Sequence, residues 1–138
     1  MRSDDARHSA LPFHSCCLMA ACLLSACSPS SRSTATATET PQSVMVRVAK
    51  QAQACWFAKK DPAFSRYKMA TELNSFSGKP RILIVPKDNP QGLPKLVAQA
   101  ERKTGGNQFS SFGPLLAGKD GKRLSASLRS WASGQTTC

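Results

Sequence analysis

The chain has 138 residues, of which 41% are hydrophobic and 20% are charged, a composition typical of one ordinary globular domain. It is too short for a dinucleotide-binding enzyme with a second domain, or for a complete TIM barrel. Two features are unusual for this length: 19 Lys and Arg face 8 Asp and Glu, which gives a net charge of +11, and there are six cysteines. These features bear on location and anchoring more than on an activity.

An apolar, uncharged segment lies near the N-terminus, at residues 18–26. Counted from Cys16, the run is about 11 residues long, which fits the core of a secretory signal peptide and is well short of the ~20 residues of a membrane-spanning helix. The residues before it carry two arginines but also two aspartates, so this signal is less positive than most. We therefore expect residues 1–26 to direct export.

The apolar segment ends in Leu24-Ser25-Ala26-Cys27, which resembles the lipobox of bacterial lipoproteins. The resemblance covers about the first fifth of the chain. It implies that the Cys27 thiol receives a diacylglyceryl group, that residues 1–26 are cleaved off, and that the new N-terminus is acylated. Ser28 stands where an Asp would retain the protein in the inner membrane, so the resemblance implies a lipid anchor in the outer membrane, facing the periplasm.

Cleavage after residue 26 would change which histidine and cysteine residues the mature protein contains. Both histidines leave with the signal peptide, which excludes His-based catalysis and His metal ligands; we expect no metal and no cofactor. With Cys27 acylated, Cys55 and Cys138 remain as one pair, and an oxidising compartment favours a disulfide between them. Such a bridge would stabilise the domain by roughly 4 kcal/mol on the chain-entropy view. The alternative is a buried free Cys55 and a frayed terminal Cys138.

Residues 27–40 form a different kind of segment, the lipidated Cys followed by a stretch rich in Ser and Thr. Ser28–Thr40 contains no Leu, Ile, Val or aromatic residue, so it cannot bury enough apolar surface to fold alone. We expect a flexible tether of 13 residues with a root-mean-square reach of roughly 20 Å.

The remaining residues, 41–138, contain the elements of a folded domain. Thr40-Pro41 is typical of a helix start, and the apolar residues that follow it at helical spacing are Val44, Val48, Ala52 and Cys55. Asp61-Pro62 predicts a short turn. Strands are predicted at 67–73, 81–85, 95–101 and 108–112, although the residue types of 95–101 also favour a helix. Leu124, Leu128 and Trp131 predict a C-terminal helix that ends near Gly134.

This order of elements predicts an α+β fold. A small antiparallel sheet of about four strands would carry the N- and C-terminal helices on one face, tied by the disulfide. The aromatic residues are expected in the core, with one alternative: Trp56-Phe57, beside Lys59-Lys60, could contact a membrane interface or a sugar.

No motif predicts an enzyme. Residues 113–120 have the Gly and Lys spacing of a phosphate-binding loop, but Asp120 replaces the hydroxyl that would bind magnesium. Ser65 and Lys68 match one short element of the penicillin-recognising enzymes and 103–105 another, but a third element is absent and the chain is far too short. Asp61, Asp88 and Asp120 are expected as helix caps and turn residues.

The basic residues are spread along the domain, and the simplest interpretation is a solvated surface. The functional alternative is a surface for anionic partners: anionic lipid, lipopolysaccharide or an acidic cell-wall polymer. The candidates are Lys59, Lys60, Lys122 and Arg123. Export argues against nucleic acid as the partner.

Three functions follow from these patterns. The first is a lipid-anchored, non-enzymatic binding, assembly or structural module of the cell envelope. The second is a small periplasmic hydrolase, or an inhibitor of an envelope enzyme, which a close carboxylate pair or an open cleft would favour. The third, a cytosolic nucleic-acid binder, requires that the signal peptide does not function.

Overall fold

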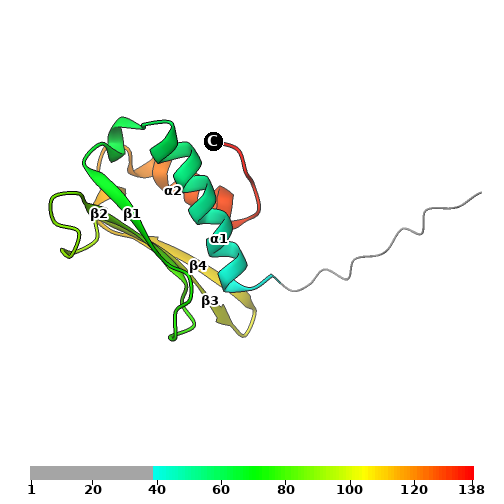
Figure 1. Cartoon of the computed structure of the whole chain (residues 1–138). Coiled ribbons are helices and arrows are strands. Elements are labelled where there is room, and N and C mark those ends of the chain that lie inside the picture. The colour runs from blue at the N-terminus through cyan, green and yellow to red at the C-terminus, as the bar shows by residue number, and fades with distance from the viewer. Residues whose placement is uncertain (1–38) are drawn as a thin grey trace, which may run out of the picture. The chain divides into compact units, whose positions relative to one another are not determined.

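Four strands form one antiparallel sheet in the order β1-β2-β3-β4, and both long helices lie on the same face of it (Figure 1). This computed structural model describes residues 39–138, so the expected signal peptide, Cys27 and residues 28–38 of the expected tether lie outside the described residues. The elements are α1 (Pro41–Ala52), η1 (Gln53–Ala58), η2 (Pro62–Phe64), β1 (Tyr67–Glu72), β2 (Arg81–Pro86), β3 (Leu96–Lys103), β4 (Gly106–Phe112), η3 (Pro114–Leu116) and α2 (Gly121–Ala132). The α+β prediction is confirmed.

The first helix begins where the sequence predicts. The Thr40 side chain accepts a hydrogen bond from the Ser43 backbone N–H, the Ser43 hydroxyl accepts one from the Thr40 N–H, and Pro41 occupies the first turn. The α-helix ends at Ala52, however, and continues as the π-helix η1, in which i→i+5 hydrogen bonds give a wider turn. Cys55 and Trp56, adjacent in sequence, are both buried in η1.

Strand β3 settles the ambiguity at residues 95–101 in favour of a strand. Leu96, Ala98 and Ala100 alternate toward the helices and are fully buried, opposite Ile84 and Ile82 on β2. Helix α1 packs over β3, which explains the small side chains: alanine lets a helix lie close to the sheet. Alanine favours a helix in an isolated peptide, but in β3 its small side chain makes room for α1 against the sheet.

The core is centred on two tryptophans. Trp56 stacks on Phe64 with ring centroids 4.5 Å apart, and its centroid lies 5.0 Å from that of Trp131 on α2. Because Trp56 is 2% exposed, it is not available to a membrane or a sugar. The expectation that every aromatic residue lies in the core is wrong for Phe76 and Phe112, which are exposed.

The C-terminal segment is fixed by several contacts. Leu124, Leu128 and Trp131 are buried as predicted, and α2 ends in a Schellman motif in which Gly134, at φ 110°, takes the left-handed position. The Trp131 indole N–H donates to the Thr137 carbonyl oxygen at 2.8 Å.

The predicted disulfide between Cys55 and Cys138 is present, and it joins η1 to the end of the chain with 5.5 Å between the Cα atoms. The bridge closes a loop across 83 positions of sequence. Cys55 is 7% exposed, whereas Cys138 is exposed, so the bridge connects the core to the surface.

The domain has two opposite ends along the sheet. At one end α1 begins, the Gln42 amide donates to the Asn74 side chain, and the Glu39 carbonyl oxygen accepts from Arg102 and Asn107. We call this the tether end, because the chain enters the domain there (Figure 1). The opposite end contains η2, η3, the β2–β3 loop and the start of α2. Within residues 39–138, no helix is both long enough and apolar enough to cross a bilayer.

Candidate anion-binding surface

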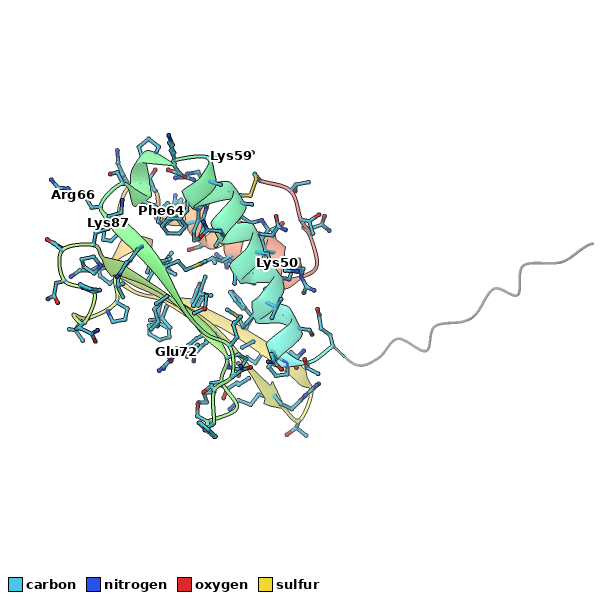
Figure 2. The ribbon with its side chains drawn as sticks, in the orientation of Figure 1. Lys50, Lys59, Phe64, Arg66, Glu72 and Lys87 are labelled. Atoms are coloured by element: carbon cyan, nitrogen blue, oxygen red, sulfur yellow. A yellow bond between two sulfur atoms is a disulfide. The ribbon has the colours of Figure 1, made fainter. Side chains whose placement is uncertain are left out.

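Basic side chains from five places in the chain lie at the end opposite the tether end. They are Lys60 after η1, Arg66 before β1, Lys87 after β2, Lys95 before β3 and Lys119 before α2. We call the surface that these five residues form the basic end. Figure 2 shows Arg66 and Lys87 projecting from this side of the domain. Their convergence follows from the antiparallel sheet, since β1 and β3 begin where β2 ends.

Two adjoining shallow hollows lie within the basic end. The first, of about 380 Å³, is lined by Arg66, Tyr67, Lys95 and Lys119 among others. The second, of about 700 Å³, shares Arg66, Tyr67 and Lys95 and adds Lys87. The phenol of Tyr67 and the ammonium and guanidinium groups are all hydrogen-bond donors, which is the donor set that phosphate and carboxylate oxygens require.

The backbone holds these side chains in place. The Lys95 N–H donates to the Ile84 carbonyl oxygen at 2.8 Å, and the Lys95 carbonyl oxygen accepts from Leu115 at 2.9 Å. The Lys87 N–H donates to the Arg66 carbonyl oxygen at 2.9 Å. The basic end is therefore carried on fixed backbone rather than on a long loose loop.

Charge pairing differs between the two ends. Toward the tether end, Lys79 and Lys103 both pair with Glu101, and Arg81 pairs with Glu72. The hydrogen bond from Lys79 lowers the pKa of Glu101, and Lys103 adds to this effect.

At the basic end, none of the five cations has a carboxylate oxygen of residues 39–138 within 4.0 Å, the limit for an ion pair. Asp88 lines the larger hollow and Asp120 the smaller one; both reduce the local positive charge, and neither pairs with any of the five cations. Toward the tether end the carboxylates thus pair with several cations, whereas at the basic end Asp61 and Asp120 pair with Arg123 and leave the five cations without a carboxylate partner.

The four residues singled out from the sequence fare differently. Lys59, Lys60 and Lys122 are exposed, with Lys60 in the basic end and Lys59 beside it at the end of η1 (Figure 2). Arg123 is engaged: it donates to Asp61 at 2.7 Å and lies 3.6 Å from an oxygen of Asp120. The guanidinium is therefore not free to bind an external anion.

The contact between Arg123 and Asp61 also bears on the expected carboxylate pair of a hydrolase. Asp61 and Asp120 do come together, but Arg123 contacts both. Burial would raise the pKa of Asp61, but hydrogen bonds from Arg123 and from the Ala63 N–H outweigh burial and lower it. A carboxyl group that stays ionised does not act as a general acid at neutral pH, so Asp61 does not fit the acid of an acid–base carboxylate pair. Asp61 caps η2 as expected, whereas Asp120 makes no side-chain cap to α2.

The short enzyme-like motifs do not form sites. In the segment that resembles a phosphate loop, the backbone N–H groups of Leu116, Ala117 and Gly121 donate to carbonyl oxygens of the same loop, so they do not converge on a ligand. Lys68 lies in a strand, not one helical turn after Ser65, and residues 103–105 lie at the tether end.

Sequence reasoning missed four residues of the basic end as candidates: Arg66, Lys87, Lys95 and Lys119. Lys87 and Lys95 are isolated lysines in sequence. The pairing of β1 with β2 brings Lys87 to Arg66, and the pairing of β2 with β3 brings Lys95 to the same end. Their positions could have indicated this, because Lys87 lies just after one predicted strand and Lys95 at the start of the next, so both lie at the same end of an antiparallel sheet.

Comparison with known protein families, with curated proteins and with solved structures found no match to this chain.

Proposed function

We propose that this chain is a lipid-anchored protein of the cell envelope whose domain binds anionic groups, phosphate or carboxylate, through the basic end. The observation that carries the proposal is a group of five cations without an ion-pair partner among residues 39–138. Four of them line two adjoining hollows, and Lys60 lines a third, smaller hollow together with Lys87. The lipobox resemblance at Leu24-Ser25-Ala26-Cys27 supports the anchor.

The expected strength of this binding is modest. Each Lys or Arg near an anionic surface contributes about 1 kcal/mol, so four engaged together give roughly 4 kcal/mol, which is close to millimolar affinity. An anchor at Cys27 would raise the effective concentration of the domain at the envelope, so weak contacts would suffice.

The placement of the two ends bears on the partner. The tether enters beside Pro41, and α1 with η1 extends away from that point for about 25 Å at ~1.5 Å per residue. A tether with a reach of roughly 20 Å favours orientations in which the basic end faces away from the anchoring membrane. This favours an acidic cell-wall polymer, while anionic lipid and lipopolysaccharide offer the same chemistry.

Binding to three purified probes tests the basic end: cell-wall sacculi, lipopolysaccharide and vesicles with anionic lipid, each at low and high salt. Lys95→Glu should weaken binding about tenfold. Lys50→Glu should weaken it less than twofold, because Lys50 is exposed on α1 and lines neither hollow. Both variants change the net charge by the same amount. Equal losses in the two variants, or binding that salt does not weaken, would refute a specific basic end.

The anchor is tested separately by cell fractionation and intact-mass measurement. The mature protein should lack residues 1–26 and carry lipid on Cys27, and Cys27→Ser should leave the membrane fraction. A membrane-associated chain that retains Met1 would refute the anchor and leave the binding test unaffected.

A further inference from the structure

Strand β4 (Gly106–Phe112) is an edge of the sheet that lacks the usual protection. Natural edge strands avoid pairing with other chains by means of charged residues, prolines or bulges. The other edge, β1, carries Lys68 and Glu72, whereas β4 reads GNQFSSF, with no charge and no proline over seven residues. Its register with β3 is continuous from Gly106 to Phe112.

The hydrogen-bond pattern shows which residues of β4 face the open edge. The Ala100 N–H of β3 donates to Pro80 on the β2 side, so the backbone groups of Gln99 and Glu101 point the other way, toward β4. Their partners on β4 are Ser110 and Gln108. By alternation, the N–H and C=O groups of Asn107, Phe109 and Ser111 point outward, and no strand of residues 39–138 pairs with them.

A groove runs between this edge and α2. A hollow of about 290 Å³ is lined by Phe109, Ser110 and Ser111 of β4 and by Ser125 and Arg129 of α2. On α2, Lys122 precedes Ser125 by three residues and Arg129 follows it by four, so all three lie on one side of the helix. No acidic residue occurs in α2, and among residues 39–138 no carboxylate lies within 4.0 Å of Lys122 or Arg129.

We propose that the edge of β4 binds an extended acidic peptide segment of a partner protein, which adds to the sheet as a fifth strand. Outward backbone groups would supply the hydrogen bonds, and Arg129 and Lys122 would face carboxylates on the segment. On the open face of the sheet, apolar side chains of the same segment would contact Phe112, which is 52% exposed. The pattern of such a segment is therefore acidic on one face and apolar on the other.

Charge decides between this partner and a second copy of the same chain. Two copies that join through β4 would each bring a net charge of +11, and their α2 cations would lie near each other. An acidic segment instead meets complementary charge along the groove. This proposal does not depend on the anchor or on the basic end, because none of the residues of the basic end lines the groove.

The test uses the peptide Thr-Val-Glu-Val-Glu-Val-Thr with blocked ends, and Thr-Val-Lys-Val-Lys-Val-Thr as its control. The Glu peptide should bind and slow the hydrogen exchange of the Asn107, Phe109 and Ser111 amides, and the Lys peptide should bind at least tenfold more weakly. Absence of binding at millimolar Glu peptide, or protection confined to other strands, overturns the proposal.

Paired proline variants locate the binding edge. Ser111→Pro removes an outward N–H of β4 and should weaken binding about tenfold, while Thr71→Pro removes an outward N–H of β1 and should leave binding unchanged. Arg129→Gln should weaken binding about fivefold and reduce its dependence on salt. Equal effects of the two prolines would overturn the proposal, with thermal unfolding as the check that both variants fold.

Two other occupants of the edge would also overturn it. One is a second copy, which would appear as a dimer in sedimentation with the β4 amides protected in the absence of peptide. The other is the chain's own tether, which would appear as the same protection in a monomer, lost when residues 28–37 are deleted.

Discussion

Arg123 donates to Asp61 across 62 positions of sequence, at 2.7 Å and 3.3 Å to the two carboxylate oxygens. This bidentate contact joins the first turn of α2 to the cap of η2, and so connects two of the walls around the basic end. The same contact removes Arg123 from the set of cations that could meet a ligand. Arg123 thus connects the elements that carry the basic end, while other basic residues supply its charge.

The first prediction concerns this pair and its dependence on pH. Asp61 is the more buried partner, with a side chain 15% exposed against 48% for Arg123. Asp61→Asn should lower the free energy of unfolding by about 1–2 kcal/mol at pH 7, because both the ion pair and part of the cap to Ala63 are weakened.

The sign of the pH effect follows from the lowered pKa of Asp61 in the folded state. The stabilisation is present above the unfolded pKa of about 3.9 and is lost as pH falls through the folded value. The gap between wild type and Asp61→Asn in urea unfolding should therefore be constant from pH 7 to pH 5 and should close in more acidic solution. A gap that persists unchanged at pH 2 would assign the loss to side-chain packing instead.

The second prediction concerns the disulfide. Reduction of the wild-type domain and Cys138→Ser should each lower stability by roughly 4 kcal/mol, because both open the same long loop. Cys55→Ser should cost about 1 kcal/mol more, since it also leaves a hydroxyl among apolar side chains. Chemical unfolding with and without reductant measures all three. Equal stability of the oxidised and reduced wild type would contradict the assigned role of the bridge.

The third prediction concerns the close approach of α2 to η3. A Cβ atom at Gly121 would lie 1.9 Å from the Leu116 carbonyl oxygen, which is a backbone atom that cannot rotate away. Gly121→Ala should therefore cost about 3 kcal/mol despite the better helix propensity of alanine. Gly118→Ala in the same loop is the control, because its nearest contact is an ordinary 3.6 Å. Thermal unfolding should separate the two variants; similar midpoints would show that α2 can shift.

Local patterns predicted most of the fold because the elements begin and end on local chemistry. The Thr40 cap, the Ile82 to Val85 run and the α2 face of Leu124 and Leu128 each depend on neighbours in sequence. The π-helix η1 was not predicted, since nothing in 53–58 breaks a helical pattern; the packing of Cys55 and Trp56 into one core accompanies it.

The candidate site was harder to predict because it depends on pairing between distant segments. Lys87 lies beside Arg66 through the β1–β2 register, and Lys95 reaches the same end through the β2–β3 register. Arg123 is excluded from the basic end by its contact with Asp61. The sequence shows runs of adjacent basic residues, but it does not show which of these residues form ion pairs with carboxylates. Likewise, the large apolar side chain of Phe76 is typical of a core residue, but Phe76 lies in an exposed loop.

The last prediction concerns the orientation of the domain on the proposed anchor. Phe76 and Leu93 are both exposed large apolar residues, at 111% and 84%, but they lie at opposite ends of β2. Phe76 is two residues from Asn74, which contacts Gln42 where the tether enters, whereas Leu93 lies in the loop before Lys95. A lipid on Cys27 would therefore hold Phe76 near the bilayer and Leu93 away from it.

Single tryptophan substitutions measure this difference in the lipidated protein, reconstituted in vesicles that contain brominated lipid. Bromine quenches only nearby indole rings, and the two native tryptophans are buried and give a common background. Phe76→Trp should be quenched and Leu93→Trp should not, and Cys27→Ser should abolish the quenching of Phe76→Trp. Stronger quenching at Leu93→Trp would mean that the basic end turns toward the anchoring membrane. Its ligand would then be the anionic lipid of that membrane rather than a cell-wall polymer, because four cations held at one leaflet would engage the headgroups directly.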